Sequence, residues 1–459
     1  MMKPKGPRGS GAEEAAMKLK LTHVQIIVAG FLGMAVLGTL LLMLPAASAD
    51  RHPAPFLTAL FTAVSSSCVT GLVLRDTGSS WSGFGQAVIL LLIQIGGLGF
   101  MTVATFLYHI FQKRMGLWGR ELMVESINTS QVGGIMRLAR QIVILTAGIE
   151  GAGALLLLIR FWPRFGFGRG LWLSVFHSVS AFCNAGFDLL GIVSPGSSFT
   201  GYADDWLVNL TLMVLIQVGG LGFLVWDDLL LRRLEYKRWR LHTKLVLITS
   251  AVLTFGGALL FLFFERSATG EGLSAWGRIW TALFASVTAR TAGFNSVSIP
   301  DMSGAGKLLT IFLMIIGGSP GSTAGGVKTT SVAVIALFTF ASFRGREKPT
   351  AYGRSISAET FRKSCSILFF NIGLALLAAI VLCAIQPLDP LDAVFETVSA
   401  IGTVGMSTGI TSSLRPVSAL VVALLMFLGR VGSVSFAVAL LAKRSAPPVE
   451  YPVEEITVG

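Results

Sequence analysis

The sequence predicts an all-α integral membrane protein assembled from four tandem repeats. Its composition is the first indication: 53% of the 459 residues are hydrophobic and only 13% are charged, whereas soluble domains carry about 25% charged residues. Long apolar runs are the second. The first of them, 24–44, is long enough to cross a bilayer core of about 30 Å. It is also too long for the central region of a cleaved signal peptide.

A short motif that occurs four times is the third indication. Each copy reads Phe-x-x-Val, then Ser or Thr, a short polar stretch and a glycine. The copies begin at Phe61, Phe176, Phe284 and Phe395. Each copy lies between two apolar spans, which indicates an internal structural repeat.

Each predicted repeat contains an outer helix, a half-crossing pore helix, an extended loop and an inner helix. The segment that ends at the motif has about 11–14 apolar residues, too few to cross a bilayer. The outer helices are expected at 22–45, 138–160, 242–264 and 364–386, and the inner helices at 86–108, 207–230, 306–340 and 417–442. Eight full spans would then surround one pore with pseudo-four-fold symmetry.

This division predicts six parts of the chain. They are a cytoplasmic N-terminal segment 1–21, pore repeat 1 at 22–110, pore repeat 2 at 111–232, pore repeat 3 with a broken inner helix at 233–342, pore repeat 4 at 343–444, and a C-terminal tail 445–459.

The basic residues predict the orientation. Five segments, 1–21, 111–140, 231–244, 341–363 and 443–444, hold 24 Lys and Arg, and the opposite loops hold nine. Positive charge gathers on the cytoplasmic side of membrane proteins, so both termini are expected to be cytoplasmic. The net charge of +12 does not favour DNA binding, because no soluble basic domain remains.

The glycine loops are the candidate ion-binding site. A non-helical loop at membrane depth must be buried or line water, and backbone carbonyls can replace the hydration shell of a cation. Turning successive carbonyls to one side requires positive φ, which glycine adopts easily. No loop residue is acidic, which argues against a divalent-selective ring. The expected selectivity filter comprises Val69, Thr70, Gly71, Asn184, Ala185, Gly186, Thr291, Ala292, Gly293, Thr403, Val404 and Gly405.

The third inner span contains a helix-breaking segment rich in glycine with one proline. A proline kink and a flexible intramembrane loop both fit this composition. Broken helices at membrane depth often mark an ion pathway. The segment comprises Gly317, Gly318, Ser319, Pro320, Gly321, Ser322, Thr323, Ala324, Gly325 and Gly326.

Several charges lie within apolar sequence. Arg430 lies in the fourth inner span, where a charge is functional by default, although a buried ion pair between helices would also explain it. Lys328 follows the broken segment, where it would repel a cation or pair with a carboxylate. An ion pair between Arg290 and Glu396 is conceivable. Glu150 could serve helix packing or a sodium site.

Two further features have simpler interpretations. The pairs Gly96-Gly97 and Gly219-Gly220 are typical of close helix packing. Cys68, Cys183, Cys365 and Cys383 show no metal-binding spacing and are expected to be buried free thiols.

Taken together, the four glycine loops, the SPGST segment at 319–323 and Arg430 resemble the Trk/Ktr/HKT superfamily of potassium transporters over residues 22–442. The KtrB group, the pore subunits of bacterial Ktr uptake systems, is most similar. The extra N-terminal pair of spans usual in bacterial Trk pore subunits has no counterpart here. Serine at the first filter position accompanies sodium permeation in some plant members, so Gly71 resembles the potassium-selective pattern.

The resemblance implies potassium (K+) uptake through the filter and possible activation by sodium (Na+). It implies that 317–326 is a gating loop below the filter, with Arg430 facing the pore beside it as a barrier together with Lys328. It also implies a homodimer working with a cytosolic, KtrA-like ring of nucleotide-binding subunits in the bacterial cytoplasmic membrane. This chain has no P-loop or GxGxxG motif, so no nucleotide site is expected in it.

The basic segments 232–244 and 344–363 are candidate docking surfaces for that ring, although topology signals and contact with anionic lipid explain them equally well. A membrane enzyme is disfavoured, since no cluster of carboxylates, histidines or a nucleophile is evident. A secondary transporter of organic solutes is disfavoured because such folds often break one helix in each half, and here only one inner span is expected to break. A sodium-permeable pathway remains the nearer alternative.

Overall fold

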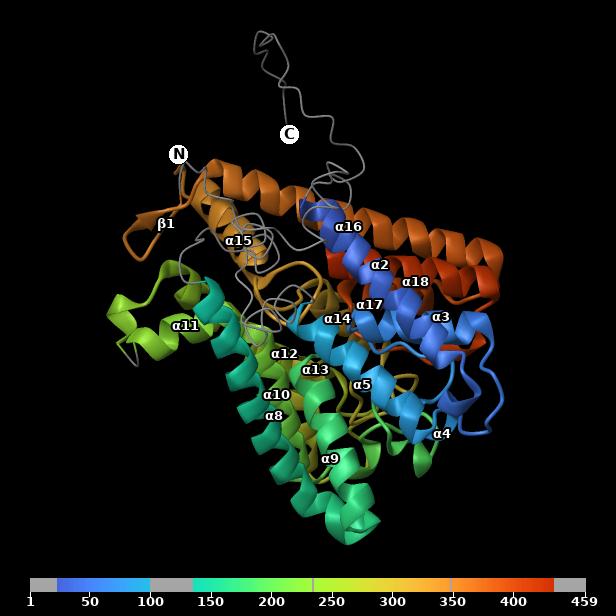
Figure 1. Ribbon diagram of the computed structural model, residues 1–459. Helices are drawn as coiled ribbons and strands as arrows, with labels where there is room; N and C mark the ends of the chain where they lie inside the picture. Colours follow the sequence, from blue (N-terminus) through green and yellow to red (C-terminus); the bar gives the residue numbers. More distant parts are fainter. Residues whose placement is uncertain (1–22, 100–134, 233–234, 347–348, 433–459) are drawn as a thin grey trace, which may run out of the picture.

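The computed structural model describes residues 23–99, 135–232, 235–346 and 349–432 (Figure 1). The described chain is mainly helical; its paired strands are β1 (Thr350–Ala351) and β2 (Arg354–Ser355), antiparallel with Thr350 opposite Ser355. The N-terminal segment 1–21, the tail 445–459, the basic pair 443–444 and most of the basic segment 111–140 lie outside the described residues.

Within the described residues, four helices are long and apolar enough to cross a membrane, or five if the bent pair α10–α11 (Trp206–Leu221 and Phe223–Arg232) counts as one span. The four are α2 (His23–Leu42), α8 (Ile135–Phe165), α12 (Leu241–Phe264) and α16 (Ala358–Ile385). They coincide with the predicted outer spans, although α8 and α16 extend further than predicted. Many of their apolar side chains are exposed on the protein surface, including Phe263 and Phe369, as expected of helices that face lipid.

A shorter helix follows each long one and ends at a glycine loop. These helices are α3 (Phe56–Ser67), α9 (Phe167–Phe182), α13 (Ala275–Thr288) and α17 (Pro390–Gly402). The motif phenylalanines Phe61, Phe176, Phe284 and Phe395 are fully buried. Lipid is as apolar as these side chains, so exclusion of water does not favour their burial. Close van der Waals packing stabilises them in the interior instead.

The helices after the loops begin one to three residues before the predicted inner spans. They are α5 (Gly83–Leu98), α10 (Trp206–Leu221) with α11 (Phe223–Arg232), α14 (Gly304–Ile315) with α15 (Thr329–Phe343), and α18 (Pro416–Val431). The predicted continuations of α5 to 108 and of α18 to 442 lie largely outside the described residues. The count of eight spans therefore stays a prediction.

The expectation that only the third inner span is broken is wrong. Helices α10 and α11 meet at an angle of 93°. Gly222 ends α10 with a φ of 93°, and the Phe223 amide donates to the Gly321 carbonyl at 2.7 Å instead of continuing the helix. A hydrogen bond from a distant segment thus replaces a helical one, which the local sequence does not reveal.

In the third inner span, a loop at 316–328, here called the central loop, separates α14 from α15. The proline-kink interpretation is therefore wrong. The Gly317 amide donates to the Val327 carbonyl at 2.9 Å, and a bridge joins Ile316 and Val327. These contacts close the loop at its neck, where the chain leaves α14 and returns toward α15.

Small connecting elements complete the described chain. They are α4 (Thr77–Ser80) and the 3₁₀ turns η1 (Pro45–Ala47), η2 (Leu190–Ile192), η3 (Thr200–Tyr202), η4 (Tyr236–Arg238) and η5 (Ile410–Ser413).

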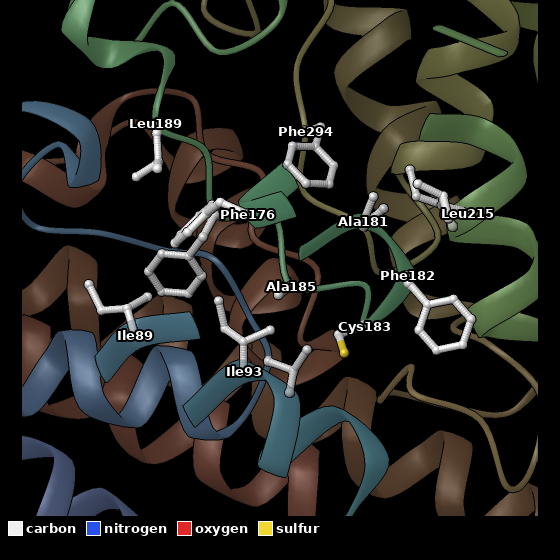
Figure 2. Close-up of a cluster of buried hydrophobic side chains, with 14 of the residues drawn as sticks. Ile89, Ile93, Phe176, Ala181, Phe182, Cys183, Ala185, Leu189, Leu215 and Phe294 are labelled. Carbon is white, nitrogen blue, oxygen red and sulfur yellow. The ribbon is translucent and has the colours of Figure 1, made fainter. Parts of the chain in front are cut away.

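The short helices pack in the interior between the longer ones. Figure 2 shows Ile89 and Ile93 of α5 beside Phe176 of α9 and Ala185 of the second glycine loop, all within one buried cluster. The second loop is thus held from behind by side chains of neighbouring helices.

Candidate functional site: a ring of glycine loops

The four glycine loops meet one another in a closed cycle. A Cβ placed on Gly186 would lie 2.8 Å from the Ala292 carbonyl oxygen, and one on Gly293 would lie 2.5 Å from the Val404 oxygen. Added carbons on Gly71 and Gly405 would overlap the carbonyl oxygens of Ala185 and Thr70. Each loop therefore approaches the next so closely that only glycine fits.

The backbone of all four loops follows the same unusual path. The glycines Gly71, Gly186, Gly293 and Gly405 have φ values of 98°, 68°, 82° and 92°. Two residues earlier, Val69, Asn184, Thr291 and Thr403 have φ values of 57°, 58°, 69° and 51°. Left-handed conformation is costly for a β-branched residue, so its repetition in loops at the helix ends indicates a functional constraint.

The hydroxyl group in each motif fastens the loop to its short helix. Ser65 Oγ accepts from the Gly71 amide at 3.0 Å, and Ser399 Oγ accepts from the Gly405 amide at 3.1 Å. Ser180 and Thr288 donate to the carbonyls of Phe187 and Phe294, each at 2.7 Å. The sequence showed Ser or Thr in each copy, but this role was missed, because the partner is a backbone group six or seven residues further along the chain.

An outer cavity of about 400 Å³ opens on one side of the ring, and all four glycines line it. Among the described residues that line it, Asp76 and Asp188 are the ionisable side chains. The pKa of Asp188 is raised to about 7, mainly by burial and secondly by the negative charge of the nearby Asp76 carboxylate. Neither aspartate was predicted; Asp188 lies two residues beyond Gly186, and this short spacing was the available signal.

The central loop lies on the other side of the ring. A Cβ on Gly317 would lie 3.3 Å from the Thr291 side chain. The Ser319 amide donates to the Gly220 carbonyl at 2.9 Å, at the end of α10. Ser319 and Thr323 are fully buried. The ring thus lies between an open cavity and a buried, hydrogen-bonded loop.

Arg430 joins the central loop to the first half of the chain. Its guanidinium donates to the carbonyls of Thr323 in the loop and of Gly96 and Gly97 at the end of α5; the bond to Gly97 measures 3.1 Å. The buried ion pair considered for Arg430 is therefore wrong, since its partners are neutral carbonyls. Lys328 likewise pairs with no carboxylate of the described residues: its Nζ donates to the Ala324 carbonyl at 2.7 Å.

The predicted packing role of the paired glycines fits the structure. A Cβ on Gly96 would overlap the Ser67 carbonyl, and one on Gly219 would overlap the Phe182 carbonyl. Gly429 approaches Ile401 in the same way. These close approaches bring the inner helices against the ends of the short helices, as small residues allow in membranes.

The suggested ion pair between Arg290 and Glu396 is wrong. Arg290 donates to Gln217 at 2.9 Å and to Thr254 at 2.7 Å. Glu396 instead accepts from the hydroxyls of Ser407, at 2.7 Å, and Thr411.

Glu150, behind the second loop, corresponds to Thr254 behind the third, because Gln217 donates to the Thr254 hydroxyl at 2.7 Å as Gln94 donates to Glu150. Gln94 donates to the Glu150 carboxylate at 3.2 Å, while Cys183, three residues before Gly186, lies 3.9 Å from it. Arg290 stands three residues before Gly293. The positions of Gln94 and Gln217, each two residues before a glycine pair, could have revealed this correspondence.

On the basic side, the structure brings the two candidate docking segments together. The Lys244 ammonium lies 4.7 Å from the ring centre of Tyr236 and 5.1 Å from that of Tyr352. Segments 232–244 and 344–363 therefore share a surface. Among the described residues, the four cysteines are free, and no group of three His, Cys, Asp or Glu side chains could hold a metal ion.

Comparison with known proteins decides the family. A family model described as TrkH, a cation transport protein, matches residues 13–447. The chain belongs to the TrkH cation transport family. With its long apolar helices, it is an integral membrane protein. The resemblance inferred from the loops, the SPGST segment and Arg430 is confirmed.

Curated relatives of this TrkH-family chain extend over nearly its whole length. It is 38% identical to the potassium/sodium uptake protein NtpJ of Enterococcus hirae, with 96% of this chain and 98% of the relative covered. It is 36% identical to Ktr system potassium uptake protein B of Bacillus subtilis, with the same coverage. The crystal structure of the potassium transporter TrkH from Vibrio parahaemolyticus has the same fold, with a TM-score of 0.72 at 18% identity, covering 92% of this chain and 84% of that one.

Proposed function

We propose that this chain takes up potassium across the bacterial cytoplasmic membrane through the glycine ring. In this proposal four repeats and eight spans surround one pore, with both termini in the cytoplasm. The closed cycle of Gly71, Gly186, Gly293 and Gly405 carries the proposal. Carbonyls of such loops can replace the water around a potassium ion, and the names of relatives that take up potassium support this choice of ion.

The central loop is proposed as the gate, with Arg430 and Lys328 as the barrier beside it. The loop is buried directly against the ring and has hydrogen bonds to α10. An ion that leaves the ring toward the cytoplasm would meet this loop, so transport requires it to move.

Partners of the chain are also proposals. Relatives named as parts of a Ktr system support a second component, which we propose is a cytosolic, KtrA-like ring of nucleotide-binding subunits. The joint surface around Lys244, Tyr236 and Tyr352 is its proposed docking site. A homodimer and activation by sodium complete the proposal. The alternative function is a sodium-permeable pathway, which the name of the potassium/sodium uptake relative favours.

The function is tested by rubidium uptake into vesicles that hold the purified protein, with sodium as competitor. We expect the wild type to take up rubidium and Gly71→Ser to lose much of its preference over sodium, because the serine side chain would displace the Ala185 carbonyl. No rubidium flux, even with a cytosolic nucleotide-binding partner present, would instead favour transport of an organic solute. Equal competition by sodium in the wild type would favour the sodium-permeable alternative.

Outer pH should change the apparent affinity for the ion. The pKa of Asp188 is about 7, so its carboxyl group is protonated as outer pH falls below that value and the negative charge beside the ring is lost. We therefore expect the KM for rubidium to rise several-fold between about pH 8 and about pH 6, since a tenfold change needs only about 1.4 kcal/mol.

This pH effect is measured as the KM for rubidium at a series of outer pH values. Asp188→Asn should show a raised KM at all of them and little pH dependence. Asp50→Asn, at an exposed position outside the cavity, is the matched control and should behave like the wild type. A wild-type KM independent of outer pH would contradict the role of Asp188.

A further inference from the structure

We propose that an apolar pocket behind the neck of the central loop holds the end of an acyl chain from a bilayer lipid. The pocket has a volume of about 120 Å³. Its walls come from α14, the C-terminal end of the central loop, α16 and α17, and include Ile315, Val327, Ala375, Val398 and Ile401. The polar side chain in the lining is Asn371, whose amide donates to the Ile367 carbonyl at 2.8 Å.

The pocket exists because the third inner span is broken. Helix α14 ends at Ile315, and the chain then turns into the central loop rather than continuing along α16 and α17. Gly326, which also lines the pocket, has a φ of 66° and no side chain to fill the space. Apolar cavities of comparable size, about 150 Å³, stay dry and bind small hydrocarbons, so water is not the expected occupant.

The position of the pocket identifies the occupant. Its rim includes Leu376, which is 47% exposed, on the apolar spanning helix α16. On the same helix Leu377 and Ile380 are strongly exposed. In a membrane this surface meets acyl chains, and a chain end beside Leu376 needs to move only a short way to reach the pocket. Deeper in the pocket, Val327 and Ile401 are 2% and 4% exposed, so lipid at the outer surface does not touch them.

The occupant would contact the neck of the central loop. Val327 accepts from the Gly317 amide and is paired with Ile316, so a chain end against Val327 and Gly326 supports the closed neck. If the central loop is the gate, the length or loss of this chain end would change the rate of transport. That consequence rests on the proposed function, whereas the binding of the chain end does not.

Photocrosslinking tests the pocket directly. The full chain is placed in vesicles of phosphatidylcholine that carries a diazirine at the end of one acyl chain, and the modified residues are mapped by peptide mass spectrometry. We expect modification at Val327 or Ile401 as well as at exposed Leu377. Modification only at exposed positions would overturn the proposal, and so would a pocket covered by a second copy of the chain and closed to lipid.

A filled pocket provides the matched comparison. Ala375 is 2% exposed and lines the pocket, and methionine fills irregular gaps. Ala375→Met should lower crosslinking at Val327 and Ile401 relative to Leu377 by about tenfold, equivalent to about 1.4 kcal/mol. Gly373→Ala, on the same helix with open space around the added carbon, should leave the pattern unchanged. Rubidium uptake by each variant is recorded separately, so failure of transport and failure of lipid binding are distinguishable.

Discussion

Gly405→Ala should abolish selective rubidium uptake. The added Cβ would overlap the carbonyl oxygen of Thr70, and the position has a φ of 92°, which is unfavourable for alanine. The ring must therefore open between the first and fourth loops, which displaces carbonyls that would bind the ion. We expect uptake to fall at least about tenfold, because about 1.4 kcal/mol of lost stabilisation is enough for that change. Initial rates of rubidium uptake into vesicles measure it.

Gly409→Ala is the matched control for this experiment. Gly409 has a φ of 98° and lines the same outer cavity, but the nearest atom to an added Cβ there is 3.7 Å away, on Pro300. The two variants share the backbone strain and differ in contact with the ring. Equal loss of uptake in both would show that strain, and not closure of the ring, explains the defect.

Arg430→Ala should raise rubidium flux, or free it from regulation. The substitution removes a positive charge beside the proposed pathway and the hydrogen bonds that join Thr323 of the central loop to Gly96 and Gly97 of α5. Hydrogen bonds to charged groups contribute about 1.5–3 kcal/mol each, so their loss should favour the open loop. We expect flux to rise about tenfold or more, since about 1.4 kcal/mol suffices for each factor of ten.

Two further variants separate the charge of Arg430 from its contacts. Arg430→Lys keeps the positive charge but lacks the planar fork that reaches several carbonyls at once. Low flux in the lysine variant would show that the positive charge limits transport. High flux would show that the hydrogen bonds between Arg430 and the backbone carbonyls do so. Arg415→Ala, at the start of the same helix and bonded to the Ile385 carbonyl, controls for loss of an arginine. Flux and regulation unchanged in Arg430→Ala would contradict both roles.

The class of the protein and the position of its loops followed from local sequence. Apolar length predicts helices that span a membrane, and a glycine after a polar stretch predicts a turn with positive φ. Both properties depend on residues close together in the chain. The break at 317–326 was visible for the same reason, because glycine and proline disfavour a helix wherever they occur.

Contacts between distant segments required the structure. The break at Gly222 arises where Phe223 bonds to Gly321, a partner about 100 residues away in the chain. Arg290 and Glu396 have opposite charges, yet the packing of α10, α12 and α13 gives Arg290 neutral partners instead. A charge pattern shows which groups can attract, but not which ones meet.

The sequence by itself therefore determined a mainly helical membrane protein of the TrkH family with four glycine loops, a broken third inner span and an arginine within an apolar span. Only the tertiary structure decided that the loops close into a cycle, that Arg430 joins the central loop to α5, and that the broken span leaves a pocket beside α16. The reason is physical: backbone conformation responds to neighbouring residues, whereas these contacts depend on how helices far apart in the chain pack together.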